Sequence, residues 1–318
     1  MPHAVIAQDV SSVEVRAVVH AAMLSSTPVQ VVSTGAAGIA GAHLELLRAP
    51  GTLAVGSVEF LRAAMLAAGV DEPAPMSYPV ELKRSMGREI HQVTAGQARA
   101  GLDHWPWQPD GRGISPDLQQ PQGVAPANPG DRRSAPGAFF VKPVATKLFT
   151  GFVFDPAAPA ADLDEHDREQ RQVFMDLPAG ELVWVSPAVE FLCEWRIYVS
   201  AGAEIGRARY DADGEDDAPI PNSDEISAMI NELSPVQPVA LDVGVTSGGR
   251  TVLVEVNDAW AIGLYGKALT PARYTEFLFE RWQKILSPAH NPAIAAGFAD
   301  HPRATSPGFR AGKNSARM

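Results

Sequence analysis

Residues 251–259 read TVLVEVNDA, a stretch in which branched apolar residues alternate with other residues. Side chains alternate between the two faces of a β-strand, so this pattern predicts a strand with one apolar and one polar face. Glu255 and Asn257 would point to the same face, about 7 Å apart along the strand. Asparagine is disfavoured inside strands, which suggests that Asn257 has a functional task. The residues expected to face a core are Val252, Val254 and Val256.

Residues 239–245, VALDVGV, predict a second strand just upstream. Its apolar side chains at alternate positions form one face, and Asp242 lies on the opposite face. The short turn over residues 247–250 contains two glycines, which favours an antiparallel hairpin. If the two strands pair, Asp242 lies beside Glu255 and Asn257.

These three side chains form a candidate metal site. Carboxylate and amide oxygens are ligands that suit Mg²⁺, which usually keeps some waters and bridges to phosphates; Mn²⁺ accepts the same ligands. The alternative is a solvated sheet face without a metal. The predicted metal ligands are Asp242, Glu255 and Asn257.

A pair of lysines follows an apolar segment that begins at Phe139. Lys142 lies in a predicted strand over residues 138–144, and Lys147 and Gly151 come shortly after it. Lysines on either side of a turn can contact triphosphate oxygens as point charges, and a glycine lets the backbone approach a ligand. The alternative is two surface lysines beside a hairpin.

Glu194 and Arg196 are expected on one face of a strand over residues 194–199. Arg196 can stabilise negative charge on a transferring phosphoryl group, and Glu194 can accept hydrogen bonds from ribose hydroxyls. The alternative is that these two side chains form ion pairs with each other or across the sheet.

Four segments in this order resemble the ATP-grasp family. They are VKPVATKLFTG (141–151), VEFLCEWRIYVSAG (189–202), ALDVGV (240–245) and VLVEVNDA (252–259). The resemblance covers about residues 139–265 and is greatest to a subgroup of ATP-grasp proteins from bacteria and phages. The last two segments also resemble amino-acid ligases that add glutamate to protein termini.

The resemblance implies a role for residues on the adenine and phosphate side. Lys142 and Lys147 would contact the phosphates and the adenine side, and Lys147 would also act in catalysis. The segment 189–192 resembles the hinge between the two ATP-grasp subdomains. There the main chain of Glu190 and Leu192 would pair with the adenine edge.

The resemblance also implies roles around the transferred phosphoryl group. Glu194 would hold the ribose, and Arg196 would contact the γ-phosphate or an acyl phosphate as a catalytic residue. Asp242, Glu255 and Asn257 would bind one or two Mg²⁺ ions that bridge the phosphates.

The chemistry implied is that of a carboxylate–amine ligase. ATP phosphorylates a carboxylate, and an amine or similar nucleophile displaces the phosphate, so the expected substrates are small-molecule or peptide carboxylates and amines. A phosphotransferase and a non-catalytic ATP-binding module are the alternatives. Residues 210–221 are acidic where amino-acid ligases of the family often have basic residues, which leaves Arg207 and Arg209 as the nearby cations.

The expected fold class is α+β. An ATP-grasp domain of two α/β subdomains that sandwich ATP would span residues 138–287, after a small α/β pre-ATP-grasp domain over residues 1–102. Residues 103–137 are rich in Pro and Gly and are expected to form a linker or loop, with a lid as a further possibility. Residues 288–318 are expected to be a flexible tail. Helices are predicted after the capping residues Ser57, Asn222 or Ser223, and Thr270.

A second nucleotide-binding pattern lies near the N-terminus. Gly35, Gly38 and Gly41 follow a predicted strand and precede a predicted helix, as in dehydrogenase-like proteins that bind NAD. The short apolar segment at 53–56 that follows ends without an acidic residue for the ribose. The alternative is an ordinary turn in the first domain.

Composition excludes several other classes of protein. The 318 residues carry a net charge of −11, which lacks the basic footprint of a nucleic-acid-binding protein. The one cysteine, Cys193, rules out an internal disulfide and zinc sites built on cysteine pairs. No apolar run is long enough to span a membrane and the N-terminus does not resemble a signal peptide, so a cytoplasmic protein is expected. The sequence leaves the oligomeric state open.

Overall fold

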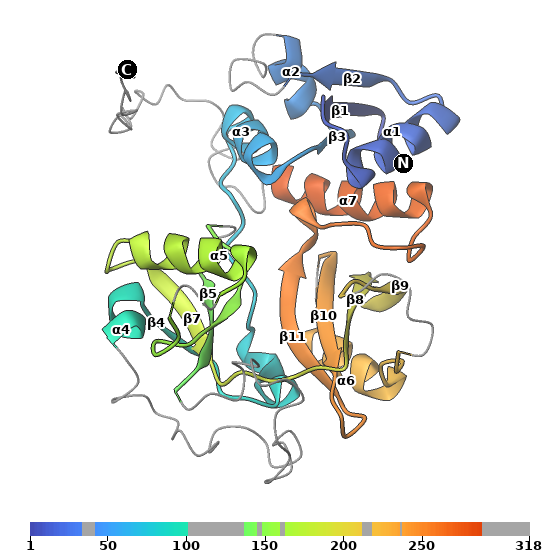
Figure 1. The fold of residues 1–318 in the computed structure, drawn as a ribbon. Helices are drawn as coiled ribbons and strands as arrows, with labels where there is room; N and C mark the ends of the chain where they lie inside the picture. The colour runs from blue at the N-terminus through green and yellow to red at the C-terminus, as the bar shows by residue number, and fades with distance from the viewer. Residues whose placement is uncertain are drawn as a thin grey trace, which may run out of the picture.

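The computed structural model describes residues 1–33, 42–100, 137–144, 148–159, 163–211, 218–235 and 237–287. These residues form three β-sheets with helices packed on them (Figure 1). The expected linker is described only at Gly137, and the expected tail, Lys147 and the glycine turn at 35–41 lie outside the described residues. The mixture of helices and antiparallel and parallel sheets confirms the expected α+β class. No helix among the described residues is long and apolar enough to cross a membrane.

The N-terminal sheet is parallel, with the strand order β2-β1-β3. Its strands and the helices between them are β1 (Ala4–Gln8), α1 (Val13–Leu24), β2 (Val29–Val32), α2 (Ala42–Arg48), β3 (Thr52–Val55) and α3 (Val58–Ala68). The side chain of Ser57 accepts a hydrogen bond from the amide of Phe60, so the predicted cap of α3 is confirmed.

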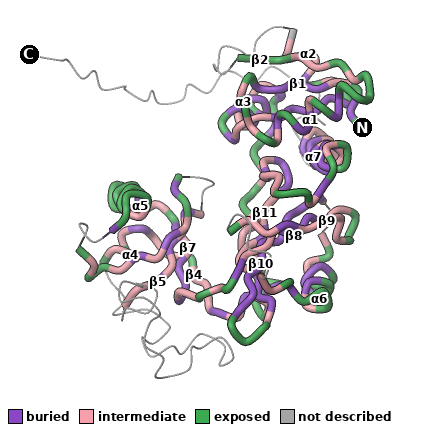
Figure 2. Tube along the Cα trace, turned by 45° about the vertical axis from the view of Figure 1, so that its right-hand side comes forward, coloured by how far each residue is buried: buried purple, intermediate pink, exposed green. Residues whose placement is uncertain are grey.

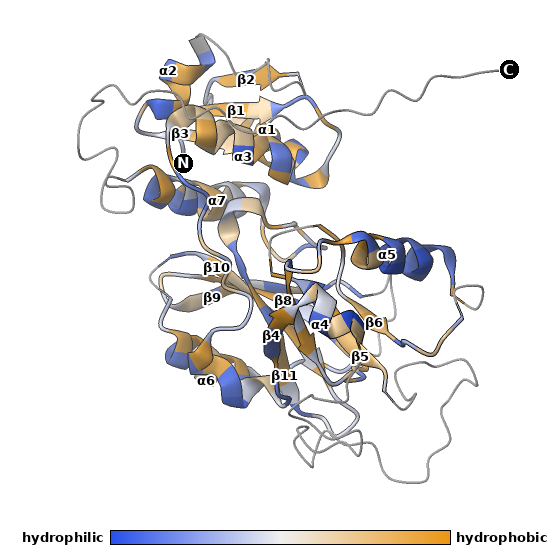
Figure 3. Cartoon of the chain, turned by 90° about the vertical axis from the view of Figure 1, so that its left-hand side faces the viewer, coloured by the Kyte–Doolittle hydropathy of each residue, from blue (hydrophilic) through white to orange (hydrophobic). Residues whose placement is uncertain are grey.

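A second, antiparallel sheet has the order β4-β7-β5-β6. Its strands and helices are β4 (His91–Thr94), α4 (Ala95–Ala100), β5 (Phe139–Pro143), β6 (Phe152–Phe154), α5 (Glu165–Asp176) and β7 (Leu182–Ser186). Phe174 is the buried residue of α5 and packs against rings from the sheet. The outer surface of α5 is exposed and hydrophilic (Figures 2 and 3). We call this sheet the aromatic wall.

A third sheet, also antiparallel, has the order β11-β10-β8-β9. Its strands and the helix after β9 are β8 (Cys193–Ser200), β9 (Ala203–Arg209), α6 (Ser223–Leu233), β10 (Val239–Val245) and β11 (Thr251–Asp258). Helix α6, capped by Asn222 as predicted, and the 3-10 helix η2 (Val80–Met86) pack on one face of this sheet. We call this sheet the charged wall.

Helix α7 (Pro271–Leu286) links the charged wall to the N-terminal sheet. It follows the 3-10 helix η6 (Ala259–Ala261), and Thr270 caps it as predicted. Its apolar residues join the N-terminal core, which also includes Tyr198 from β8. Figure 1 shows α7 lying between the N-terminal sheet and the charged wall.

The expected domain limits differ from the observed sheet pairing. β4 was expected in a first domain ending at residue 102, but it pairs with β7 in the aromatic wall. Helix α7 was expected in the ATP-grasp domain, yet it packs on α1 and β3. We therefore propose a first unit of about residues 1–70 completed by α7. Strand pairing between distant segments, which local patterns do not encode, accounts for the difference.

The predicted hairpin of β10 and β11 is confirmed, with a β-bulge that was not expected. Asp242 pairs with Glu255 and Val243 pairs with Leu253, so Val254 is an extra residue in β11. The bulge changes which side chains face the core. Leu253 and Val256 are buried there, whereas Val254, expected to face the core, lines the cleft described below.

Candidate functional site

A cleft of about 910 Å³ lies between the aromatic wall and the charged wall. Its volume falls in the range of small-ligand sites, roughly 300–1,000 Å³. Both walls contribute polar side chains to it: Lys142 from β5, Glu194 and Arg196 from β8, Asp242 from β10, and Glu255 and Asn257 from β11. The structure therefore brings together all but three of the predicted site residues.

Strand register aligns the charged wall across three strands. Asp242 on the central strand β10 is the direct neighbour of Arg196 on one side and of Glu255 on the other. Gly244 lies beside this row, and a Cβ atom there would come within 2.2 Å of the Phe191 ring. A glycine at this position thus lets the Phe191 ring lie against the sheet.

Arg196 and Asp242 form a buried two-pronged ion pair. Arg196 Nε donates to Asp242 Oδ1 at 2.8 Å and Nη2 donates to Oδ2 at 2.7 Å. The Arg196 guanidinium also lies 5.5 Å and 4.9 Å from the ring centres of Tyr210 and Tyr265. Burial alone would lower the pKa of Arg196, but hydrogen bonds to Asp242 and its charge raise it. The guanidinium therefore stays charged.

The remaining groups extend this pair into one network. Asn257 Nδ2 donates to Asp242 Oδ2 at 2.9 Å and to Glu255 Oε1 at 3.1 Å. Glu255 Oε2 forms an ion pair with Lys142 Nζ from the opposite wall. Burial lowers the pKa of Lys142 to about 8, and the nearby charge of Arg196 acts in the same direction while that of Asp242 opposes it.

Glu194 is tied to an aromatic neighbour. The Tyr210 hydroxyl donates to Glu194 Oε2 at 2.6 Å. Burial raises the pKa of Glu194, although the hydrogen bond from Tyr210 opposes that shift. Burial also raises the pKa of Tyr210, and the negative charges of Asp242 and Glu194 raise it further. The Tyr210 hydroxyl thus remains a donor.

The donor set fits a magnesium ion that is shared with a ligand. No group of three or more His, Cys, Asp or Glu side chains among the described residues is placed to hold a metal by itself. Asp242, Glu255 and Asn257 instead offer two carboxylates and an amide, and rotating the amide would turn Asn257 Oδ1 toward the carboxylates. Mg²⁺ is typically bound by one or two carboxylates together with phosphate oxygens, which matches this set.

The segment expected to pair with adenine is only partly in place. Val189 and Phe191 line the cleft, whereas Glu190 and Leu192 do not. The Leu192 amide donates to the Val245 carbonyl at 2.8 Å, so it is already used within the protein. The expectation of an adenine contact from the Leu192 amide is therefore not supported, because the chain turns into β8 at this point.

Two cations outside the cleft set are also engaged. Arg207 donates to Glu204 at 2.6 Å, and Arg209 donates to Asp211 at 2.5 Å. Both are internal ion pairs of the charged wall rather than free cations facing a substrate. Residues 212–217 of the acidic stretch lie outside the described residues.

Sequence reasoning missed Arg88, which touches both walls. Its guanidinium donates to Ser186 Oγ on β7 at 3.3 Å and to the carbonyls of Leu253 and Val254 on β11 at 3.1 and 3.2 Å. Burial lowers the pKa of Arg88, and hydrogen bonding and charge interaction with Tyr78 oppose that shift. The residues around Arg88 show no strand or helix pattern. Its position is therefore set only by the packed structure.

The glycine turn at 35–41 is poorly placed for the dinucleotide alternative. It lies outside the described residues, but β2 before it is an edge strand of the N-terminal sheet. In the dinucleotide-binding fold the glycine motif follows the central first strand. Here the central strand is β1, which leads into α1 through residues 9–12.

Comparisons with known proteins place these segments in a family. Residues 124–277 match a family model described as an ATP-grasp domain, the second family of its clade. No curated protein matches the sequence.

Several solved structures are similar at low identity. D-cycloserine synthetase DcsG is 14% identical, with a TM-score of 0.48 over 87% of this chain and 99% of that one. A RimK domain ATP-grasp protein from Sphaerobacter thermophilus is 15% identical, with a TM-score of 0.46 over 86% and 99%. A D-alanine–D-alanine ligase from Bacillus anthracis is 12% identical, with a TM-score of 0.38 over 90% and 96%. The similarity is too low to carry over a substrate. The family match and the fold nevertheless agree with the predicted resemblance, and the chain is a member of the ATP-grasp superfamily.

Proposed function

We propose that this chain is an ATP- and Mg²⁺-dependent ligase that activates a carboxylate as an acyl phosphate for attack by an amine or similar nucleophile. The observation that carries the proposal is the row Arg196–Asp242–Glu255, which faces Lys142 across a cleft in a chain of the ATP-grasp superfamily. Carboxylates for a metal and cations for phosphates meet there in one place.

The charges of the cleft suggest a division of tasks. Asp242, Glu255 and Asn257 would hold Mg²⁺, or Mn²⁺, which would neutralise phosphate charge when bound. Lys142 and Arg196 would contact phosphate oxygens, and Glu194 would face the ribose. Lys147 stays a proposed phosphate contact that lies outside the described residues. Because Lys142 pairs with Glu255 in the free protein, metal and phosphate would replace this pair by new partners of opposite charge.

The lining of the cleft supports a reaction that uses no covalent intermediate with the protein. Among the described residues that line it, none is a cysteine or histidine. Catalysis would therefore depend on positioning the reactants and on stabilising charge. The Arg196 guanidinium suits the second task, since Asp242 and two tyrosine rings hold it in place before the substrate binds.

Ligand-induced stabilisation tests the nucleotide part of the proposal. The melting temperature is measured alone, with Mg-ATP, with ATP and EDTA, and with NAD. A ligand at about 100 times its dissociation constant adds roughly 2.7 kcal/mol to the free energy of unfolding. We expect a shift with Mg-ATP that is lost in Lys142→Met and Glu255→Gln and kept in the control Lys83→Met, which changes an exposed lysine. A shift with NAD and none with Mg-ATP would contradict the proposal.

Product analysis tests the reaction part. Carboxylate and amine pairs are screened for release of ADP together with a new amide. ADP release with a phosphorylated acceptor that survives would indicate a phosphotransferase. Binding of Mg-ATP without turnover on any pair would indicate a non-catalytic module.

A further inference from the structure

The β-bulge in β11 decides which face carries the candidate metal ligands. From the turn onward, Thr251 pairs with Val245 and Leu253 pairs with Val243. A regular ladder continued from there would pair Val254 with Asp242 and Glu255 with Leu241, whose side chain is buried in the core. The extra residue shifts the register by one position, so Glu255 instead pairs with Asp242. Both carboxylates reach the cleft only because of this shift.

Arg88 contacts the bulge directly. Its Nη1 donates to the Leu253 carbonyl at 3.1 Å, and its Nη2 donates to the Val254 carbonyl at 3.2 Å. In a regular strand successive carbonyls point to opposite edges, so one guanidinium does not reach both. The two-pronged contact of Arg88 therefore fits the bulged form of β11 and not the regular form.

The surroundings of Arg88 hold the guanidinium in this position. Arg88 is only 7% exposed, and it also donates to the Met86 carbonyl at 3.2 Å and to Ser186 Oγ at 3.3 Å. β11 is an edge strand, and the Val256 amide beyond the bulge donates to the Ser77 carbonyl at 2.9 Å. The segment 77–88 thus covers the free edge of β11 on both sides of the bulge.

We propose that Arg88 is a positioning residue that clamps the bulge at Val254 and so keeps Glu255 and Asn257 on the cleft face beside Asp242. A guanidinium presents a planar fork to two carbonyls, which a lysine ammonium does not reproduce. The register part of this inference stands on the fold alone, while its ligand-binding part rests on the proposed function.

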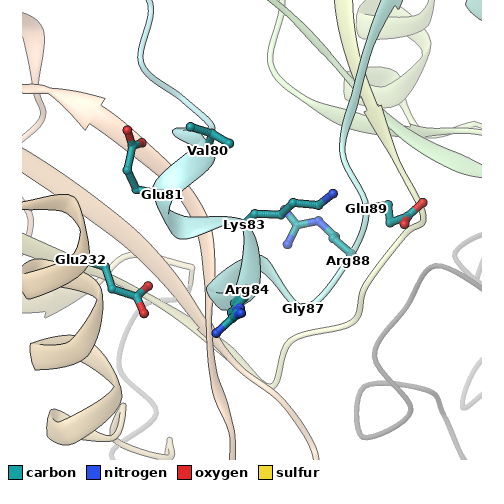
Figure 4. A pocket seen from close by; sticks show the side chains of 8 residues that line it. All are labelled: Val80, Glu81, Lys83, Arg84, Gly87, Arg88, Glu89 and Glu232. Atoms are coloured by element: carbon teal, nitrogen blue, oxygen red, sulfur yellow. The ribbon is translucent and has the colours of Figure 1, made fainter.

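Arg84 provides a matched control on the same segment. It lies four residues before Arg88, is exposed, and with Arg88 lines a shallow pocket beside η2. Figure 4 shows that the two side chains point in different directions. Arg84→Met removes the same charge as Arg88→Met without touching the bulge.

A disulfide test reads the register without any ligand. Directly opposed residues of antiparallel strands lie about 4.5–5.5 Å apart at Cα, within the range of a disulfide. Ala240 faces Asn257 in the bulged register and would face Val256 in the regular one. We expect Ala240→Cys with Asn257→Cys to cross-link in the parent and in Arg84→Met. In Arg88→Met, cross-linking should move to Ala240→Cys with Val256→Cys, and unchanged yields would overturn the clamp.

A binding test then reads the consequence for the metal. Loss of a residue that orients metal ligands typically weakens metal affinity about 10- to 100-fold, so Arg88→Met should raise the Kd for Mg-ATP by a factor in this range. Affinity for ATP in EDTA should stay near that of the parent. Arg88→Lys should lie between Arg88→Met and the parent, and it serves as the working variant if Arg88→Met does not fold.

Deletion of Val254 separates a clamp from a direct phosphate contact. Without this residue a regular ladder again pairs Asp242 with Glu255, so Arg88→Met should have little further effect on the Kd for Mg-ATP. A loss that persists after the deletion, or an equal loss for ATP in EDTA, would show that Arg88 contacts the ligand and would overturn the clamp. If the parent binds no Mg-ATP at all, the proposed function fails, while the cross-linking test still decides the role of Arg88.

Discussion

The two walls of the cleft are both four-stranded antiparallel sheets, but they are built differently. The charged wall buries Arg196 and Asp242, at 7% and 2% exposure, in the middle of the sheet. The aromatic wall is held by phenylalanines, among them Phe154 and Phe174, whose ring centres lie 5.1 Å apart. It contributes Lys142 as its charged group in the cleft.

This difference shows two ways of supporting one site. A buried charge is tolerated only when partners satisfy it, and in the charged wall those partners come from neighbouring strands in a defined register. An aromatic core depends on volume and packing instead. We therefore expect mutations in the charged wall to change stability and ligand binding together, and mutations inside the aromatic wall to change stability alone.

The largest effect is expected from Asp242→Ala. This change leaves the Arg196 guanidinium buried without its partner, so the free energy of unfolding should fall by about 3–5 kcal/mol. The stabilisation by Mg-ATP should also disappear. Urea unfolding and melting temperature with and without Mg-ATP measure both effects. Asp71→Ala, which removes an exposed carboxylate, is the control. An unchanged stability would mean that water satisfies Arg196 and that the wall is open to solvent.

Phe174→Ala tests the other side of the comparison. Phe174 is fully buried, and truncating it should lower the free energy of unfolding by roughly 3–5 kcal/mol through lost contacts and a cavity. Because Phe174 does not line the cleft, the Kd for Mg-ATP measured well below the melting temperature should stay near that of the parent. Met175→Ala, at an exposed neighbour on α5, should change stability by less than about 0.5 kcal/mol. A large loss of Mg-ATP affinity in Phe174→Ala would remove the distinction between the walls.

The smallest effect is expected from Glu280→Gln, at a partly exposed ion pair that contrasts with the buried one. Glu280 on α7 accepts hydrogen bonds from Ser200 on β8 at 2.6 Å and from Lys284 at 2.9 Å. Burial alone would raise the pKa of Glu280, but these two hydrogen bonds lower it overall. Its stabilisation is thus present above the unfolded pKa and is lost as pH falls through the folded pKa.

Glu280→Gln should therefore cost less than about 1 kcal/mol at pH 7, as is usual for a pair that solvent screens. The difference from the parent should vanish as the pH falls below the folded pKa of Glu280. Urea unfolding at several pH values between about 3 and 7, with Glu276→Gln as the control on the same helix, measures it. A cost as large as that of Asp242→Ala would contradict the contrast between buried and exposed pairs.

Much of the site could be predicted from local sequence. The alternation of β10 and β11 and the short turn between them placed Asp242, Glu255 and Asn257 together, and the structure confirms that hairpin. The helix caps at Ser57, Asn222 and Thr270 followed equally local rules and are also confirmed. Their roles toward metal and nucleotide stay predictions for the three cleft residues.

Other features could not be predicted, because they depend on contacts between distant segments. The sequence showed no sign of the extra residue at Val254, so Val254 was wrongly expected to face the core. It also did not show that the Leu192 amide donates to Val245, or that β4 pairs with β7.

The sequence by itself determined the strands, the helix caps and the type of oxygen ligand in this protein, since side-chain alternation and capping act within a few residues. The tertiary structure alone decided that Glu255 faces Asp242 rather than the core. That choice depends on a one-residue shift in strand register and on hydrogen bonds from Arg88, which is 165 residues away in the chain from Leu253. Such a register is stabilised only when both segments are folded against each other.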